Sequence, residues 1–319
     1  MIFRMYAGFF CVALPAVLAA DSAQAQEFPV KPIRIIASPP GGANNFIARL
    51  VGQGLGETFG WQVVVDNRPS GFIQGELLAR SPADGYSMLV AAGSFTIGPL
   101  MDKAPYDVIK DFTPVVLIAT SPSVLVVHSS VPSKSVKDLI ALASARKGEL
   151  NYSTSGTGSA NHLPGELFRA LAGIDIVRIN YKGAGPALSA LLGGEVHMMF
   201  ATASSAAPHT KAGRLRALAV TSAQPSALLP GLPTIASTVS GYEFVSPFGL
   251  FAPAGTPRSI INRLNQAIVK VIRQPDMVQK LHDAGNDVVA NTPEEYAAVV
   301  RSELATWSKV IKAAGLSVQ

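Results

Sequence analysis

Residues 33–49 read IRIIASPPGGANNFIAR, and this stretch decides the fold. A short β-branched run ends in Ser38–Gly42, and an amphipathic helix with Phe46 on its buried face is predicted to begin near Ala43–Asn45. In such a strand–turn–helix unit the first N–H groups of the helix point at one spot, where an anion can bind. The prolines stiffen the turn, and the glycines let a ligand approach bare backbone. The alternative is a tight connection without a ligand.

A second stretch repeats this layout. Asn151–His162 reads NYSTSGTGSANH, a strand that runs into a small-residue turn and then a helix. Serine and threonine supply hydroxyl groups, and Gly156 and Gly158 leave backbone N–H groups accessible. If each turn belongs to its own sheet, the two face each other across a cleft at the carboxyl ends of the strands. We therefore predict one ligand site that both turns share.

The rest of the chain alternates strands and helices. Strands predicted at 61–66 and 86–92 flank a helix at 72–80, an order that favours a parallel, doubly wound sheet. A second series follows, with helices predicted at 136–146, 160–171 and 186–192 and strands at 151–154, 174–181, 196–200 and 215–220.

The chain is expected to cross between two lobes. The crossings are two separate apolar runs at 115–119 and 124–127 and a return stretch that begins at Phe244. Thr256 and Thr292 are predicted N-caps of helices at 260–272 and up to Gly315. The expected division is a first lobe of residues 26–124 plus 245–319 and a second lobe of residues 125–244.

The N-terminus differs in kind from the rest. Arg4 precedes an apolar run that ends near Ala20, and Ala23–Ala25 offers an A-x-A cleavage site, so residues 1–25 are predicted to be a cleaved signal peptide. The run is too short for a membrane span. We expect a periplasmic mature protein, without disulfides because Cys11 is the single cysteine.

Composition and motifs exclude several functions. The net charge is +5 but the sequence has no lysine or arginine block and only 7% aromatic residues, which disfavours nucleic-acid binding. The third glycine of a GxGxxG motif is replaced by Asn161, and Lys182 stands where a dinucleotide site has an acid. There is no G-x-S-x-G elbow, no P-loop and no metal-ligand spacing of histidines, so we predict neither catalysis nor a cofactor nor a metal. His162 is either a ligand contact or a packing residue.

These motifs together resemble one family along nearly the whole mature chain. The matching stretches include FPVKPIRIIASPPGG, ADGYSMLVA, LNYSTSGTGSANHLPGELF, INYKGAGPALSALLGGEVHMMF and GLFAPAGTPRSIINRLN. The chain is similar to the Bug-type periplasmic receptors of tripartite tricarboxylate transport systems. The resemblance implies an α/β, type II periplasmic-binding-protein fold, in which two doubly wound lobes close on a small carboxylate. It also implies a monomer that delivers this ligand to the membrane subunits of a secondary transporter. A rival role is ligand-dependent docking on a periplasmic sensor domain.

The chain departs from the family pattern at three positions. Asn45 and Ala201 stand where the family usually has aspartate, and Phe72 stands where small residues are expected. Two missing carboxylates would leave a ligand ammonium without a partner, so we predict an amine-free di- or aromatic carboxylate, with Phe72 or Phe95 covering its body. The predicted ligand-binding residues are Ser38, Gly41, Gly42, Ala43, Asn44, Asn45, Ser94, Phe95, Thr154, Ser155, Gly156, Thr157, Gly158, Ser159, His162, Ala201 and Thr202.

Overall fold

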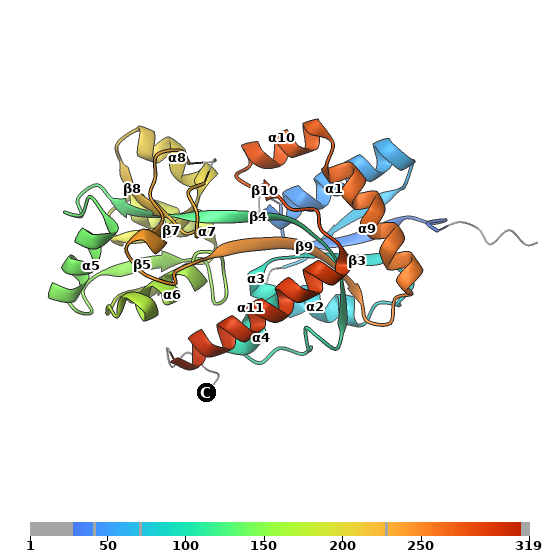
Figure 1. Ribbon diagram of the computed structural model, residues 1–319, viewed down its shortest axis with the longest axis horizontal. Helices are drawn as coiled ribbons and strands as arrows, with labels where there is room; N and C mark the ends of the chain where they lie inside the picture. The colour runs from blue at the N-terminus through green and yellow to red at the C-terminus, as the bar shows by residue number, and fades with distance from the viewer. Residues whose placement is uncertain (1–27, 41–42, 70–71, 227–228, 314–319) are drawn as a thin grey trace, which may run out of the picture.

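The computed structural model describes residues 28–40, 43–69, 72–226 and 229–313. The predicted signal peptide and the two glycines of the first turn, Gly41 and Gly42, lie outside these ranges. Figure 1 shows two halves side by side, joined by two long strands, with the last helix running along both. The first half carries the N-terminal elements and the second half carries the middle of the chain.

The sheet of the first half begins with three parallel strands in the order β2-β1-β3. As predicted, β1 leads into α1 and then β2, which is an edge strand with Val64 exposed. The bounds are β1 Ile33–Ala37, α1 Ala43–Phe59, β2 Val63–Asn67, α2 Phe72–Ala79, β3 Ser87–Ala91, α3 Gly93–Thr96 and α4 Gly98–Met101. The short helices α3 and α4 were not predicted.

The crossing strands correct the sequence prediction. The two apolar runs form one strand, β4 (Phe112–His128), which pairs with β9 (Val245–Pro253) in the first half and with β7 and β8 in the second. All of these pairings are antiparallel, as is that of β9 with β3, so each sheet is mixed rather than wholly parallel. Pro122 opposes Val245 at the end of the first sheet, and Ser123 already opposes Thr202 in the second. A single strand thus serves both sheets.

The second half repeats the parallel design in β6-β5-β7. Its helix α6 begins at Leu163, three residues later than predicted, because residues 155–162 are held as a turn by their own side chains. The bounds are α5 Val136–Ala145, β5 Asn151–Thr154, α6 Leu163–Ala172, β6 Val177–Asn180, α7 Ala184–Leu192, β7 Met198–Thr202, α8 Ala203–Lys211, β8 Leu215–Val220 and the 3-10 helix Ile235–Ser237.

The C-terminal elements return to the first half. The capping box at Thr292 is confirmed, since Glu295 N–H donates to Thr292 Oγ1 (3.2 Å) and Thr292 N–H donates to Glu295 Oε2 (2.9 Å). Thr256 is not an N-cap: its hydroxyl donates to Pro253 O, and Pro257 stands at that position. The bounds are α9 Arg258–Ile272, α10 Pro275–Asp283, β10 Asp287–Val288 and α11 Pro293–Ala313.

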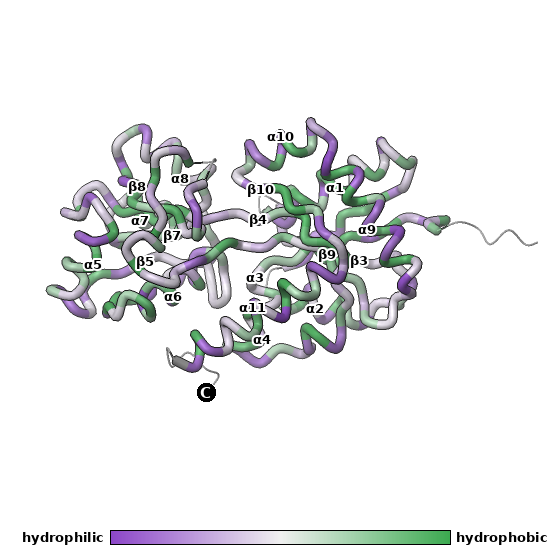
Figure 2. The backbone as a smooth tube through the Cα atoms, in the orientation of Figure 1, coloured by the Kyte–Doolittle hydropathy of each residue, from purple (hydrophilic) through white to green (hydrophobic). Residues whose placement is uncertain are grey.

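Apolar side chains fill both faces of both sheets. In Figure 2 the green segments gather where strands and helices meet, and the part of β4 between the halves is pale. Helix α11 belongs to both cores, because Tyr296 and Val300 pack under the first sheet while Trp307 and Ile311 pack in the second half. The two halves are therefore tied by β4, β9 and α11, and the space between them is bounded by the ends of helices from each.

Candidate functional site

A cleft of about 490 Å³ lies between the two halves. The first half contributes the start of α1 and the turn after α10, and the second contributes the starts of α7 and α8. The crossing strands contribute Ser121 of β4 and Phe248 of β9. The full lining is Ala43, Phe46, Ser121, Asn161, Ala184, Gly185, Leu188, Met199, Thr202, Ser204, Ser205, Phe248, Ala284 and Asn286.

Three helix N-termini meet at this cleft. Ala43 is the first residue of α1, Ala184 the first of α7, and Ser204 lies in the first turn of α8. Neither Gly183 before α7 nor Thr202 before α8 caps its helix with a side-chain hydrogen bond. The first N–H groups of a helix carry partial positive charge and lack intrahelical partners. The cleft therefore offers several unsatisfied donors from two directions.

The described side chains that line the cleft carry no formal charge. Hydroxyl and amide groups stand beside an apolar wall of Phe46, Leu188, Met199 and Phe248. Such a lining cannot neutralise a ligand cation, whereas a carboxylate finds helix N-termini and neutral donors. The arrangement suits an anion with an apolar body. It offers no nucleophile–base pair for catalysis among the described residues.

The second glycine-rich turn is built around Asn161. Its Oδ1 accepts hydrogen bonds from Ser155 N–H (3.3 Å), from the Ser155 hydroxyl and from the Ser159 hydroxyl (3.1 Å). Three donors on one oxygen fix the orientation of the amide. Asn161 is 6% exposed and lines the cleft, so the turn is a preformed wall of the site.

His162 is a packing residue of this turn. Its side chain is fully buried and does not line the cleft. Gly158 N–H donates to Nδ1 (3.0 Å), and Arg178 Nη1 lies 2.7 Å from Nε2. Burial lowers the pKa of His162, and the Arg178 charge acts in the same direction. The imidazole is therefore neutral at pH 7 and positions the turn rather than the ligand.

Behind His162 lies a buried carboxylate, Glu166, which is 4% exposed. It accepts hydrogen bonds from the Tyr152 hydroxyl (2.5 Å) and from Arg169 Nε (3.0 Å). Burial alone would raise the pKa of Glu166, but hydrogen bonds from His162 and Tyr152 and the Arg169 charge lower it to about 2. This network anchors the start of α6 from behind, away from the cleft.

Of the predicted ligand-binding residues that the structure describes, Ala43 and Thr202 line the cleft. Phe46 does so as well, which corrects its predicted place on the buried face of α1, since it is 36% exposed. A helix whose first residue opens on a site exposes its i+3 residue there too, and this spacing could have identified Phe46. Asn161 lies within the predicted second turn but was not named as a ligand residue, whereas Ser121 and Asn286 were missed because no local motif marks them.

Several other predicted residues face elsewhere. Ala201 is fully buried in the apolar core under α7 and α8, and Asn45 is 5% exposed with its Oδ1 on Arg49 Nε (3.2 Å). Phe95 packs in an aromatic cluster with Tyr106, and Phe72 contacts the same tyrosine, so neither covers the cleft. Asn44 bonds Val90 O, and the remaining predicted residues outside the lining are Ser38, Ser94, Thr154, Ser155, Gly156, Thr157, Gly158 and Ser159.

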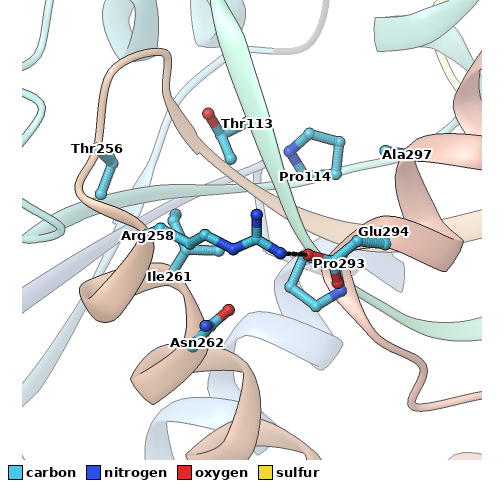
Figure 3. Close-up of a pocket in the computed structure, with 9 residues that line it drawn as sticks. All are labelled: Thr113, Pro114, Thr256, Arg258, Ile261, Asn262, Pro293, Glu294 and Ala297. Atoms are coloured by element: carbon cyan, nitrogen blue, oxygen red, sulfur yellow. Dashed lines mark hydrogen bonds and ion pairs between the residues drawn. The ribbon is translucent and has the colours of Figure 1, made fainter.

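A smaller hollow of about 240 Å³ lies in the first half, where α9 and α11 begin. Figure 3 shows Arg258 reaching across it to Glu294, with a distance of 2.6 Å between Nη2 and Oε1. This exposed pair neutralises itself, and most of the remaining lining is apolar. The cation of this hollow is therefore already paired with a carboxylate.

Two further searches concern the residues that the structure describes. None of their helices is long and apolar enough to cross a membrane. They also contain no group of three or more histidine, cysteine, aspartate or glutamate side chains placed to hold a metal ion.

Two α/β halves, joined by long strands around a cleft, define a periplasmic binding protein. Residues 47–316 match the family described as "Tripartite tricarboxylate transporter family receptor", and the chain belongs to this family. It is 38% identical over 315 residues to "UPF0065 protein in tcbD-tcbE intergenic region" of Pseudomonas sp. strain P51, covering 97% of this chain and 93% of that protein. It is 35% identical to protein BugT of Bordetella pertussis, covering 94% of each. The predicted family and fold class are thereby confirmed.

Solved structures agree with this assignment. Rpa4515 of R. palustris, solved with adipate, is 36% identical, with a TM-score of 0.83 over 91% of this chain and 99% of that one. MatC of Rhodopseudomonas palustris, with bound malate, is 27% identical, with a TM-score of 0.79 over 89% and 100% of the two chains. The chain is a periplasmic solute-binding receptor, and its family works with transporter membrane subunits.

Proposed function

We propose that this receptor captures a small, amine-free organic carboxylate and delivers it to the membrane subunits of a tripartite tricarboxylate transporter. The observation that carries the proposal is the meeting of three helix N-termini at a cleft whose described lining is uncharged. A carboxylate is the ligand that gains most from such donors. The chemistry is binding without turnover.

The energetics suffice without a cationic side chain. A hydrogen bond to a charged group contributes about 1.5–3 kcal/mol, so four or five from backbone and hydroxyl donors outweigh ordering costs and give micromolar affinity. The apolar wall adds about 25 cal/mol for each Å² of ligand that it buries. A dicarboxylate or an aromatic acid uses both the donors and this wall.

The absence of an amine follows from the same lining. A buried ammonium group needs an anionic partner, and no described side chain of the cleft supplies one. The two homologous structures described above carry adipate and malate, which are amine-free. This argument replaces the one based on Asn45 and Ala201, because neither side chain lines the cleft.

Closure of the cleft completes the proposal. Residues 26–124 with 245–319 and residues 125–244 act as two lobes that hinge where Pro122 of β4 pairs with Val245 of β9. The predicted residues of both turns bind or support the ligand, and the receptor acts as a monomer. Export places the mature protein in the periplasm.

A negative charge inside the cleft tests the proposal. Aspartate at the first turn of a helix stabilises the helix, so Ser204→Asp should leave the melting temperature unchanged or raised. The new carboxylate lies where the ligand's own carboxylate is expected and should repel it. Calorimetry with succinate, adipate and benzoate should therefore show at least a tenfold loss of affinity, relative to the unmodified protein, for each acid that binds.

Ser259→Asp is the matched control. Ser259 lies in the first turn of α9, is exposed, and is not part of the cleft. The Ser259→Asp variant should bind the acids with the same affinity as the unmodified protein. Equal affinity in the Ser204→Asp variant, or failure of all the acids to stabilise the folded receptor, would contradict the proposed function.

A further inference from the structure

The cleft contains one side-chain amide whose donors are already used. Asn286 is 3% exposed and follows α10. Its Nδ2 donates to Ala284 O (3.2 Å) and Leu281 O (3.4 Å), carbonyl groups at the end of that helix. These bonds fix the amide, because only the NH₂ group can satisfy two carbonyls. Oδ1 is left without a partner among the described residues, on a side chain that lines the cleft.

Ser121 presents the same chemistry beside it. It is 6% exposed, lines the cleft, and donates its hydroxyl hydrogen to Gly285 O (2.7 Å). With this hydrogen committed, its oxygen can only accept a hydrogen bond from the cleft side. Asn286 and Ser121 thus use the same turn, residues 284–286, to fix two acceptors, and we call this pair the acceptor subsite.

The acceptor subsite lies against the start of α8. A Cβ built on Gly285 would stand 3.7 Å from Ala203 Cβ and 3.9 Å from Ser204 N. The turn that fixes both acceptors therefore borders the N–H groups that attract a carboxylate. A ligand bound there meets donors at α8 and acceptors a few ångströms away.

We propose that the acceptor subsite selects a ligand with a hydroxyl group beside its carboxylate, that is, a hydroxycarboxylic acid. The inference rests on the proposed function, since the carboxylate must first bind at the helix N-termini. A hydroxyl donates one hydrogen bond to a neutral acceptor and needs no countercharge, whereas an ammonium needs one. The single hydrogen of a hydroxyl pairs with one of the two acceptors, whereas a methylene group at the same place pairs with neither, and a protein site penalises such a loss strongly.

Asn161 supplies the complementary group on the opposite wall. Its Oδ1 is saturated by the serines of the second turn, and its Nδ2 donates to no described residue. The two amides of the cleft are thus fixed in opposite senses, a donor from the second half and an acceptor from the first. A hydroxycarboxylate satisfies both, with a carboxylate oxygen toward Asn161 and the hydroxyl toward Asn286.

The test compares acids that differ only in the group at C2. Calorimetry measures succinate, malate and aspartate, and then glutarate and adipate beside their 2-hydroxy derivatives, with both enantiomers of each. At least one hydroxy acid should bind about tenfold tighter than its parent, the value of one good hydrogen bond. In the Asn286→Ala or the Ser121→Ala variant, whichever removes the acceptor of the ligand hydroxyl, this ratio should fall toward one.

Asn262→Ala serves as the control, because Asn262 is an exposed asparagine of α9 outside the cleft. In this variant the ratio of hydroxy-acid affinity to parent-acid affinity should match that of the unmodified receptor. Melting curves confirm that each variant is folded, and Ser121→Ala keeps the test valid if loss of the Asn286 bonds unfolds α10. Equal binding of hydroxy and parent acids, a ratio that survives both substitutions, or tighter binding of aspartate than malate would overturn the inference. Binding of no acid at all would instead overturn the proposed function.

Discussion

The two strand–turn–helix units that face the cleft look alike in sequence but are stabilised differently. Behind the second turn, Asn161, His162 and Glu166 engage nearly every polar neighbour, and the carboxylate is held by Arg169 and Tyr152. Behind the first turn the described side-chain contacts are separate hydrogen bonds rather than a network. Asn44 Nδ2 donates to Val90 O, Asn67 Nδ2 donates to Ser38 O (2.6 Å), and Arg49 Nε donates to Asn45 Oδ1. The Nδ2 atom of Asn45 is buried without a hydrogen-bond partner among the described residues.

This difference separates two ways of presenting a helix N-terminus. The second unit is rigid because buried polar groups specify one arrangement, and it should hold its shape with or without a ligand. The first unit depends on the packing of α1 against the sheet and α9, through apolar residues such as Ile47 and Val51. Substitutions of polar residues in the second unit should therefore lower stability, whereas substitutions of polar residues in the first unit should change it little.

The largest expected effect comes from removing the buried carboxylate of the second unit. Glu166→Leu leaves the buried Tyr152 hydroxyl without its acceptor and removes the carboxylate that Arg169 contacts. Loss of one member of a buried pair costs about 3–5 kcal/mol, and urea unfolding measures it. Glu149→Leu is the control, because Glu149 pairs with Arg146 at the surface and should cost less than about 1 kcal/mol. Similar losses in the two variants would show that the network is not essential.

The pH dependence of stability sharpens the contrast between buried acids. Because the pKa of Glu166 is lowered to about 2, its contribution is complete above the unfolded value of about 4.5 and is lost as the pH falls toward 2. The stability contribution of Glu303 in α11 depends on pH in the opposite direction. Burial raises its pKa to about 8, opposed by a hydrogen bond with Thr96, so its contribution is lost as the pH rises from about 4.5 through 8.

Denaturant titrations between pH 5 and 8.5 measure the second effect. Over this pH range the free energy of unfolding of the unmodified protein should fall by about 2–4 kcal/mol relative to that of the Glu303→Gln variant, whose residue 303 cannot ionise. Glu303 lies where α11 passes the crossing strands, beside Phe244 and Trp307, so its ionisation should loosen this junction first. Parallel pH curves for the two proteins would contradict the assigned burial. Glu243→Gln, which changes an exposed glutamate next to Phe244, is the matched control.

Sequence reasoning recovered the features that have a local cause. The strand before Pro39 and the capping box at Thr292 follow from neighbouring residues, and the structure contains them. Sequence reasoning missed that β4 is continuous. Pro122 predicts a break in the strand, although the position where it pairs with β9 tolerates a proline.

The cleft was predictable only in part. Ala43 and Thr202 stand at helix starts and were identified, while Ser121 and Asn286 come together only when β4 passes the turn after α10. Their spacing of 165 residues carries no local signal. The expectation from family position also misled, because Ala201, which the resemblance placed at the ligand, lies in the core.

The smallest effect is expected at Asn45 of the first unit. Asn45→Asp removes the buried unpaired Nδ2 and places a carboxylate beside Arg49 and near the N-terminus of α1. The gain from the ion pair and the helix dipole exceeds the cost of burial only modestly, so we expect about 0.5–1 kcal/mol of stabilisation, measured by thermal unfolding. Ligand preference should not change, because Asn45 does not line the cleft and its Oδ1 already faces Arg49. Asn45→Ala, which removes both polar atoms, is the control and should leave the free energy of unfolding nearly unchanged.

Calorimetry with succinate and aspartate then decides between the two interpretations of this position. A tenfold gain for aspartate in the Asn45→Asp variant would mean that residue 45 faces the ligand after all, and that the first turn selects against amines through this side chain rather than through the uncharged lining of the cleft.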